Sequence, residues 1–318
     1  MTLQSRLTEA LALRIPGDNS TAVRLRAALL ESCQTALDAA LLDAGALGRL
    51  CGTDDGLYWG AMSEVLLADK LVRAGLQPAH QEPGPDFRIE HGGKTIWIEA
   101  ITPLPSGVPC DWLNHSTGVV DFPAEALLLR WTAAIKEKAQ KLLGRPGDPG
   151  YLAKGIVQTE DAYVIAVNGL LLRMGGGGQG DGLPQLEGIS QLPLAVEATC
   201  AVGPYAMRID RNTLASVSAG HSHRPEIIRQ SRPAVPADTF YDEAFNPVSA
   251  IWAADVGYMS LLGNDQPMAV IHNPGAVASV PLGLLPSQEE FTLEIGEEEL
   301  HVHRHAGREP PRRNVVFV

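Results

Sequence analysis

The sequence predicts an α/β fold in which a mixed sheet forms the core, preceded by a helical cap and followed by a strand-rich extension. Apolar residues recur at helical spacing through residues 2–74, and two short strands rich in β-branched residues follow within residues 84–103. A second helical segment leads into an apolar run at residues 162–168, which is typical of a strand covered on both faces. With 318 residues and 45% hydrophobic content, the chain can fill such a core.

The N-terminal part of the chain, residues 1–56, predicts a helical cap. Residues 2–14 and 21–48 are rich in Leu and Ala at helical spacing, and a Pro-Gly-Asp-Asn sequence separates them. Asn19 or Ser20 is expected to cap the second helix, because short polar side chains satisfy the free N–H groups of a first turn. A Gly-Thr-Asp-Asp-Gly sequence then ends the cap.

The next helix is predicted over residues 57–74, because Gly75 directly follows it and glycine commonly ends helices. Glu64 has small or apolar neighbours at helical spacing, so it is expected at the edge of an apolar face. A short run at residues 76–81 is expected to form the first strand after this helix.

A hairpin is predicted within the sequence GPDFRIEHGGKTIWIEAITP, which spans residues 84–103. Its arms are expected at residues 87–90 and 95–101, joined by a glycine turn. Asp86 begins the first arm and Glu99 lies near the end of the second. The hairpin is expected to bring the two carboxylates side by side at one end of the sheet.

A loop or lid is predicted over residues 104–123 from its prolines and glycines, and a strong helix over residues 124–143. Its apolar residues fall within one arc of roughly 100°. These residues are Leu127, Leu128, Trp131, Ile135 and Leu142. Lys138 lies inside the same arc whereas Lys136 points away from it, so Lys138 is expected on a buried face.

The C-terminal half of the chain gives weaker signals. The glycine-rich segment 174–182 lacks the lysine ending of a phosphate-binding loop, so a flexible loop is expected. Strands are predicted at residues 248–254 and 268–272, and a second hairpin at residues 291–305 with an acidic turn over 296–299. A basic segment, residues 308–313, precedes a short apolar end. Residues 57–168 are therefore expected to form the core, and residues 169–318 to pack on its sheet or extend it.

The net charge of −12 repels phosphate overall, whereas a protein that holds nucleic acid through phosphates usually shows a basic surface. Residues 124–154 are an exception within the first half, with six basic residues against three acids.

The cysteines stand far apart without a Cys-x-x-Cys pair, which argues against a zinc knuckle or a secreted disulfide scaffold and favours a reducing compartment. The first residues carry charges and have no uninterrupted apolar segment, so neither a signal peptide nor a membrane span is expected. We therefore expect a cytoplasmic protein.

The acids of the first half predict a site for Mg²⁺ or Mn²⁺, because these cations prefer a few oxygen ligands and keep several waters. Asp86 and Glu99 can provide carboxylates, the backbone of Ala100 a carbonyl oxygen, and Glu64 a carboxylate directly or through water. A lysine nearby would orient or deprotonate the attacking water and stabilise negative charge on a phosphate. Hydrolysis of a phosphodiester suits this set of groups best.

At these residues the sequence resembles the PD-(D/E)XK nuclease superfamily, the restriction-endonuclease-like fold. The resemblance rests on Pro85-Asp86, on twelve residues between Asp86 and Glu99, on an upstream helix with Glu64, and on an αβββαβ order of elements, and it covers about a third of the chain. It implies a mixed sheet flanked by helices, with the acids and a lysine at one end of the central hairpin. It also implies a nucleic acid substrate, with DNA favoured over RNA.

The sequence departs from this family where the catalytic lysine is expected, because Ile101 occupies that position. In some branches of the superfamily the lysine lies on the following helix, and Lys138 is the best-placed substitute. If Lys138 serves, the protein is expected to be a metal-dependent nuclease. If Lys138 only extends its ammonium to solvent, a catalytically inactive binding or assembly module is the alternative. An unrelated α/β enzyme acting on a small molecule is a third interpretation, and a homo-oligomer is compatible with each.

For the remaining histidines and Cys110, the sequence pattern favours a structural role over a catalytic or metal-binding one. The alternating histidines 301, 303 and 305 suit a transition metal, but an exposed strand produces the same pattern, and His221 with His223 is a similar case. His272 ends a predicted buried strand. Cys110 lies in the predicted lid without a supporting His and Asp pattern.

Overall fold

The computed structural model describes residues 2–309, apart from residues 230–231, 265 and 296–299. Its α-helices are α1 (Leu3–Arg14), α2 (Ser20–Asp38), α3 (Ala46–Leu50), α4 (Asp55–Arg73), α5 (Cys110–Leu113), α6 (Ala124–Leu143) and α7 (Leu194–Thr199). Its strands are β1 (Phe87–His91), β2 (Lys94–Ile101), β3 (Ala162–Asn168), β4 (Val202–Ile209), β5 (Ser216–His223), β6 (Glu226–Arg229), β7 (Arg232–Pro236), β8 (Ala250–Ala254), β9 (Met268–His272), β10 (Glu289–Ile295) and β11 (Leu300–Ala306). Four short 3₁₀ helices are η1 (Leu170–Leu172), η2 (Thr239–Tyr241), η3 (Glu243–Phe245) and η4 (Tyr258–Leu262).

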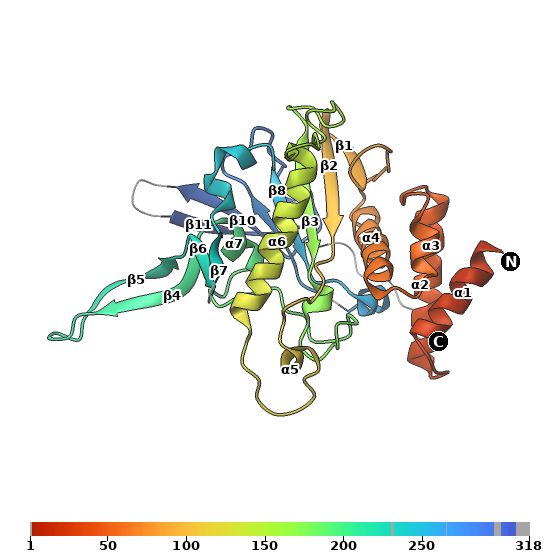
Figure 1. Ribbon diagram of the computed structural model, residues 1–318, viewed down its shortest axis with the longest axis horizontal. Coiled ribbons are helices and arrows are strands. Elements are labelled where there is room, and N and C mark those ends of the chain that lie inside the picture. Colours follow the sequence, from red (N-terminus) through yellow and green to blue (C-terminus); the bar gives the residue numbers. More distant parts are fainter. Residues whose placement is uncertain (1, 230–231, 265, 296–299, 310–318) are drawn as a thin grey trace.

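A seven-stranded sheet in the order β1-β2-β3-β8-β9-β10-β11 runs through the molecule (Figure 1). Strands β2, β3 and β8 are parallel, whereas β1 and β9 run antiparallel to their neighbours β2 and β8. Strand β10 is parallel to β9, and β11 returns antiparallel to β10. The fold is therefore mixed α/β, as predicted, and strands β8 to β11 continue the sheet that β1 to β3 begin.

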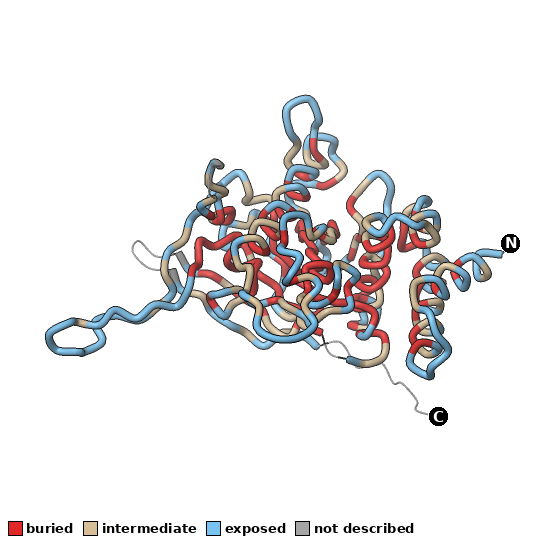
Figure 2. Tube along the Cα trace, turned by 60° about the horizontal axis from the view of Figure 1, so that its bottom comes forward, coloured by how far each residue is buried: buried red, intermediate tan, exposed pale blue. Residues whose placement is uncertain are grey.

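Two apolar layers cover the two faces of this sheet. The first layer joins α1 to α4 with every second residue of the central strands, such as Ile98 on β2 and Val164 on β3. The second layer joins α6 and α7 with the alternate residues, such as Trp97 and Ile165. Because successive side chains of a strand point to opposite faces, neighbouring residues of β2 belong to different layers. Figure 2 shows the buried interior that results.

Most predicted elements of the first half are present with similar bounds. Asn19 caps α2 by accepting a hydrogen bond from the N–H of Ala22, 2.9 Å away. Gly75 follows α4 with φ +76°, a conformation that favours glycine. The helix predicted over residues 21–48 is wrong in its length, since α2 ends at Asp38. There the N–H of Leu41 bonds to the carbonyl of Ala36, which turns the chain back toward the core.

The prediction of three strands between the two long helices is wrong. The order from α4 to β3 is αββααβ, because the short helix α5 lies within the predicted loop 104–123. Residues 76–81 make only an isolated bridge, in which Ala79 pairs with Arg88 of β1. Pro78 has no N–H to donate to a ladder, which stops a longer strand from forming there.

The C-terminal half contains the strands predicted near residues 250 and 270 and the second hairpin, whose acidic turn lies outside the described residues. The segment 174–182 is a loop, as expected, and the basic segment is described only as far as residue 309. No helix within the described residues is both long and apolar enough to cross a membrane.

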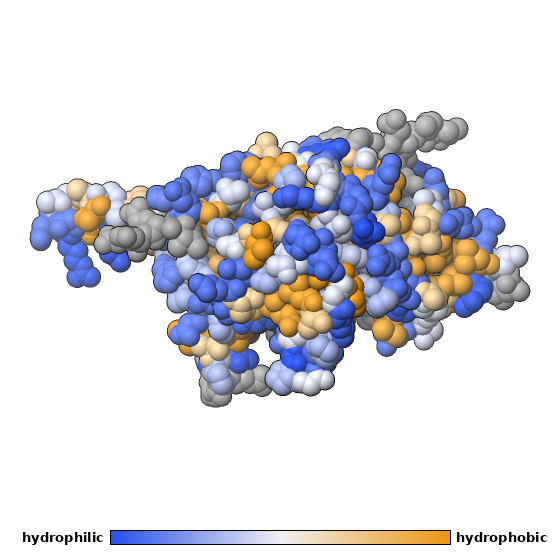
Figure 3. Space-filling model, turned by 90° about the horizontal axis from the view of Figure 1, so that it is seen from above, coloured by the Kyte–Doolittle hydropathy of each residue, from blue (hydrophilic) through white to orange (hydrophobic). Residues whose placement is uncertain are grey.

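Two hairpins in this half are not predicted by the sequence pattern. Strands β4 and β5 pair in a two-stranded sheet of their own, and β6 pairs with β7 in another. The β4–β5 hairpin, which we call the arm, projects from the body on the side away from α1 (Figure 1), and its chain is exposed almost throughout (Figure 2). Apolar residues are present on it among hydrophilic ones (Figure 3).

Candidate functional site

Glu99 lies near the end of β2 with its side chain directed toward α6. Its neighbours Ile98 and Ala100 belong to the opposite layer, so the alternation of the strand assigns Glu99 to the α6 side. The side chain of Glu99 is only 1% exposed. A carboxylate buried this deeply needs a compensating positive charge or hydrogen bonds.

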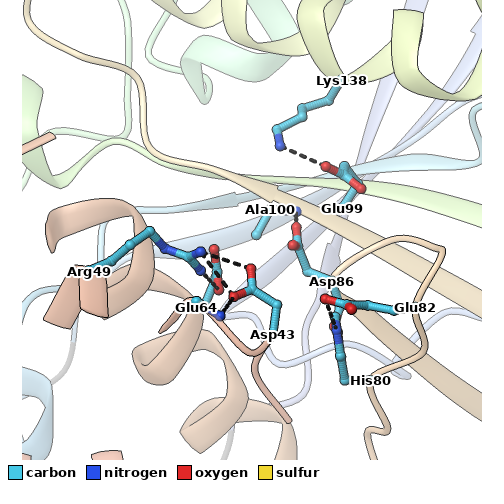
Figure 4. Close-up of polar contacts among 10 residues, drawn as sticks. Asp43, Arg49, Glu64, His80, Glu82, Asp86, Glu99, Ala100 and Lys138 are labelled. Atoms are coloured by element: carbon cyan, nitrogen blue, oxygen red, sulfur yellow. Dashed lines mark hydrogen bonds and ion pairs between the residues drawn. The ribbon is translucent and has the colours of Figure 1, made fainter. Parts of the chain in front are cut away.

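Lys138 supplies this charge. Its Nζ lies 2.7 Å from Oε1 of Glu99, and its side chain is 10% exposed on the buried face of α6 (Figure 4). The structure therefore brings together the acid of the hairpin and the lysine that the sequence singled out on the following helix.

Lys141 joins the same carboxylate and was missed in the sequence. Its Nζ lies 2.6 Å from Oε1 of Glu99, while 46% of its side chain remains exposed. Partial burial opposes the charged form, but the adjacent Glu99 carboxylate outweighs this and raises the pKa of Lys141. The sequence does contain a signal for Lys141. It follows Lys138 by three residues, a spacing that places both lysines on one side of the helix.

Tyr151 completes the surroundings of Glu99. Its hydroxyl donates toward the second carboxylate oxygen, Oε2, over 3.4 Å, and it also lies 3.3 Å from the carbonyl of Gly84. Burial and then the charge of Glu99 raise the pKa of Tyr151 to about 12, so the hydroxyl stays protonated at neutral pH. Oxygen Oε2 thus has a weaker partner than Oε1.

Asp86 lies beside Glu99 at the start of β1. The last ladder pair of the hairpin joins Phe87 to Ile98, so Asp86 stands opposite Glu99 one step further along. Its Oδ2 accepts a hydrogen bond from the N–H of Ala100 at 2.6 Å (Figure 4). Burial and then the charge of Glu99 raise the pKa of Asp86 to about 6, although Lys138 and the Ala100 N–H oppose this.

Glu64 approaches the site from α4, on the other side of β2 from Lys138 (Figure 4). Its Oε2 lies 3.4 Å from Nη2 of Arg49. The other terminal nitrogen of this guanidinium, Nη1, lies 2.9 Å from Oδ2 of Asp43. Burial and then the charge of Asp86 raise the pKa of Glu64 to about 7, while Arg49 acts in the opposite direction. Glu64 is therefore coupled to Asp86 electrostatically but held by Arg49.

The four predicted side chains thus form a charged cluster with a division inside it. Glu99 and Lys138 are in direct contact, and Asp86 is anchored next to them by the N–H of Ala100. Glu64 is coupled to Asp86 through its charge, whereas its bonded partner is Arg49. The pKa values of Asp86 and Glu64 are both raised, first by burial and then by the negative charge of a neighbouring carboxylate.

The oxygen donors suit a hard divalent cation with few protein ligands. Among the residues that the structure describes, no three His, Cys, Asp or Glu side chains are grouped closely enough to hold a metal. Two carboxylates, from Asp86 and Glu99, together with the carbonyl of Ala100 remain, and Mg²⁺ is often held by one or two carboxylates besides water and substrate phosphate. A cation there would counter the repulsion between the neighbouring carboxylates of Asp86, Glu99 and Glu64.

The histidines singled out in the sequence and Cys110 are separate from this cluster, whereas Nδ1 of His80 lies 3.0 Å from the carbonyl oxygen of Asp86. His303 lies 3.5 Å from Glu294 on the exposed hairpin, and the rings of His301 and His303 are 6.4 Å apart. His272 lies 2.8 Å from buried Glu290. Cys110 is an exposed free thiol at the start of α5.

The chain gives no significant match to protein-family models, to curated proteins or to solved structures.

Proposed function

We propose that this protein is a metal-dependent nuclease with a restriction-endonuclease-like core, hydrolysing phosphodiester bonds at the cluster of Glu99, Asp86 and Lys138. The observation that carries the proposal is the 2.7 Å contact between Nζ of Lys138 and Oε1 of Glu99. The hairpin has no lysine two residues after Glu99, and this contact supplies an ammonium group at the carboxylate from the following helix.

Asp86, Glu99 and the carbonyl of Ala100 would hold Mg²⁺ or Mn²⁺, with Glu64 nearby. When bound, the cation supplies Lewis acidity toward the phosphate and lowers the pKa of water. The protein's own contribution is positional and electrostatic. Lys138 fixes the Glu99 carboxylate and places a positive charge where negative charge develops on the phosphate during attack.

Lys141 would provide a second positive charge for the phosphate, nearer to solvent than that of Lys138. Because nearly half of its side chain is exposed, its ammonium can meet a phosphate that enters from outside, whereas Lys138 is enclosed. The basic helix α6 would thus face the nucleic acid backbone. Phosphate contacts of this kind do not depend on the base sequence. We favour DNA over RNA as the substrate because of the resemblance to restriction-endonuclease-like nucleases.

The test is cleavage of single- and double-stranded DNA and RNA, with and without Mg²⁺ or Mn²⁺, by wild type and by Asp86→Ala. We expect metal-dependent cleavage of at least one substrate by wild type and none by the variant. Equal cleavage by both proteins, or no cleavage of any substrate, would overturn the proposal.

A catalytically inactive binding or assembly module is the second candidate. The hydrogen bonds that the Glu99 carboxylate already accepts from two lysines favour it. Both lysines bond to the same oxygen of this buried carboxylate, which makes a stable ion cluster without any metal. Calorimetric titration with Mn²⁺ separates the two candidates. Micromolar binding that Asp86→Ala abolishes supports the enzyme, and no binding by wild type supports the module.

A further inference from the structure

A cavity lies beside α6, on the flank of this helix that faces away from the Glu99 cluster. Its volume of about 290 Å³ is at the lower end of the range of roughly 300 to 1,000 Å³ that small-molecule sites occupy. Three parts of the chain line it, namely the second half of α6, the end of β7 and the segment of η2 and η3. At 100° per residue, the lining residue Lys136 and the cluster residue Lys138 point about 160° apart on α6. The cavity is therefore separate from the proposed nuclease site.

The cavity combines one ammonium group with two carboxylates. Nζ of Lys136 lies 3.4 Å from the carbonyl oxygen of Pro236, which leaves further hydrogens of this ammonium to donate. Asp238 and Asp242 also line the cavity, and within the described residues no ion pair joins either of them to Lys136. Partial burial lowers the pKa of Lys136, and the charges of the two acids oppose this. The cavity thus offers charges of both signs that are not paired with each other.

Thr239 adds a buried hydroxyl group that lacks a partner. Its side chain lines the cavity and the residue is 3% exposed, yet Oγ1 forms no hydrogen bond among the described residues. Buried hydroxyl groups in folded proteins nearly always have a partner, because leaving one unpaired lowers stability. A ligand that places an acceptor oxygen in the cavity would provide this partner.

The remaining lining is apolar or belongs to the end of a helix. Ala139, Leu143 and Phe245 contribute hydrocarbon to the wall. The lining also includes Gly144, which directly follows the last residue of α6. The macrodipole of a helix is negative at this end, so it adds to the two carboxylates in favouring a cationic group.

We propose that the cavity binds a free α-amino acid with an apolar side chain about the size of leucine. Asp238 and Asp242 accept hydrogen bonds from its ammonium group, and Lys136 donates to its carboxylate. The hydroxyl of Thr239 is a second donor to this carboxylate. A zwitterion suits the cavity better than an ion of either sign, because groups of both charges line it and each needs an opposite partner when the ligand displaces water.

The side chain of the amino acid packs against Leu143 and Phe245. Its size is limited by the small volume of the cavity. Because Glu99 is bound on the other flank of α6, amino acid binding and phosphodiester cleavage are expected to be independent of each other.

The experiment is isothermal titration calorimetry of the intact chain with three ligands that share one hydrocarbon chain. Leucine carries both charges, leucinamide lacks the carboxylate, and 4-methylpentanoate lacks the ammonium group. We expect leucine to bind with a Kd of about 0.1 mM and each of the others to bind at least about tenfold more weakly. No binding of leucine at about 10 mM, or binding of either other ligand as tight as that of leucine, would refute the proposal.

Variants of the two acids test where the ammonium group binds. Asp238→Asn and Asp242→Asn each remove one charge, and asparagine can still cap η3, where Oδ1 of Asp242 accepts a hydrogen bond from the N–H of Ala244 at 2.9 Å. Each variant should raise the Kd for leucine by about tenfold. Glu243→Gln is the matched control, because Glu243 is an exposed acid on η3 that does not line the cavity. It should change this Kd by less than about twofold.

Variants of the donors test where the carboxylate binds. Lys136→Met should raise the Kd for leucine by about tenfold and leave that for leucinamide unchanged, because only the carboxylate meets this lysine. Thr239→Val keeps the shape of the side chain without its hydroxyl and should raise the Kd for leucine by about fivefold. Circular dichroism checks that each variant is folded. Wild-type affinity for leucine in Asp242→Asn or in Lys136→Met, or equal effects of Asp242→Asn and Glu243→Gln, would contradict the assignment.

Discussion

Lys138 and Glu99, 39 residues apart in the sequence, meet with Nζ 2.7 Å from Oε1. The contact joins the helix α6 to the hairpin strand β2, and it places a nearly buried ammonium beside a carboxylate that is 1% exposed. A pair enclosed in this way is costly to break, because either partner alone leaves an uncompensated charge in the interior.

Glu99→Gln is therefore expected to destabilise the protein by about 3 kcal/mol, since two lysines would then face each other without a counter-charge. The free energy of unfolding, measured with urea, checks this. Glu137→Gln is the matched control, because Glu137 lies exposed on α6 beside Lys138, and it should change stability by less than about 0.5 kcal/mol. Adding Lys138→Met to Glu99→Gln should recover part of the loss. Equal effects of the two glutamine variants would show that Glu99 is not the centre of the ion cluster.

Lys141→Met is expected to weaken substrate binding more than turnover. Its exposed ammonium would meet phosphate in both the ground state and the transition state, so KM should rise by about tenfold while kcat falls by less than about threefold. Steady-state kinetics on a labelled oligonucleotide give both constants. A fall in kcat as large as that of Lys138→Met would assign the two lysines the same role.

The pH dependence of stability follows from the raised pKa values of Asp86, about 6, and Glu64, about 7. Each carboxyl binds its proton more tightly in the folded state than in the unfolded state. These two groups therefore contribute favourably to the free energy of unfolding at low pH. This contribution is lost as the pH rises from about 4 to about 7.

Mg²⁺ or Mn²⁺ should offset this loss, because a cation favours the ionised carboxylates. We expect the metal to raise Tm by about 2 to 4 °C near pH 7.5 and by less near pH 5. Thermal unfolding with metal or with EDTA measures this, and Asp86→Asn should remove most of the metal effect. A metal-induced rise in Tm that persists unchanged in Asp86→Asn would place the cation elsewhere.

The regular parts of the fold could be predicted from the sequence because local patterns determine them. Helix α6 has the predicted bounds, since its apolar arc is continuous and Gly144 ends it. The hairpin turn was evident from Gly92 and Gly93, which both adopt positive φ. Residues 76–81 do not form the predicted strand, because Pro78 interrupts them and has no N–H to donate to a ladder.

The arm could not be predicted because its strands lack the alternation that burial imposes. β5 reads SVSAGHSH, a composition typical of a loop, and its pairing with β4 becomes visible only in three dimensions. In the site, Lys138 was found because it interrupts an apolar face. Lys141 was missed because it lies at the exposed margin, where lysine is common. The attachment of Glu64 to Arg49 depends on the packing of α3 against α4, which no local pattern encodes.

The central claim, that Lys138 replaces the lysine missing from β2, is tested most directly by comparing Lys138→Met with Lys136→Met in a Mg²⁺-dependent cleavage assay. Lys136 lies on the same helix, but its Nζ bonds to the carbonyl of Pro236 instead of Glu99. We predict that Lys138→Met lowers kcat by about 10² to 10³-fold and that Lys136→Met retains activity within about threefold of wild type. Cleavage by folded Lys138→Met at the wild-type rate would contradict the account.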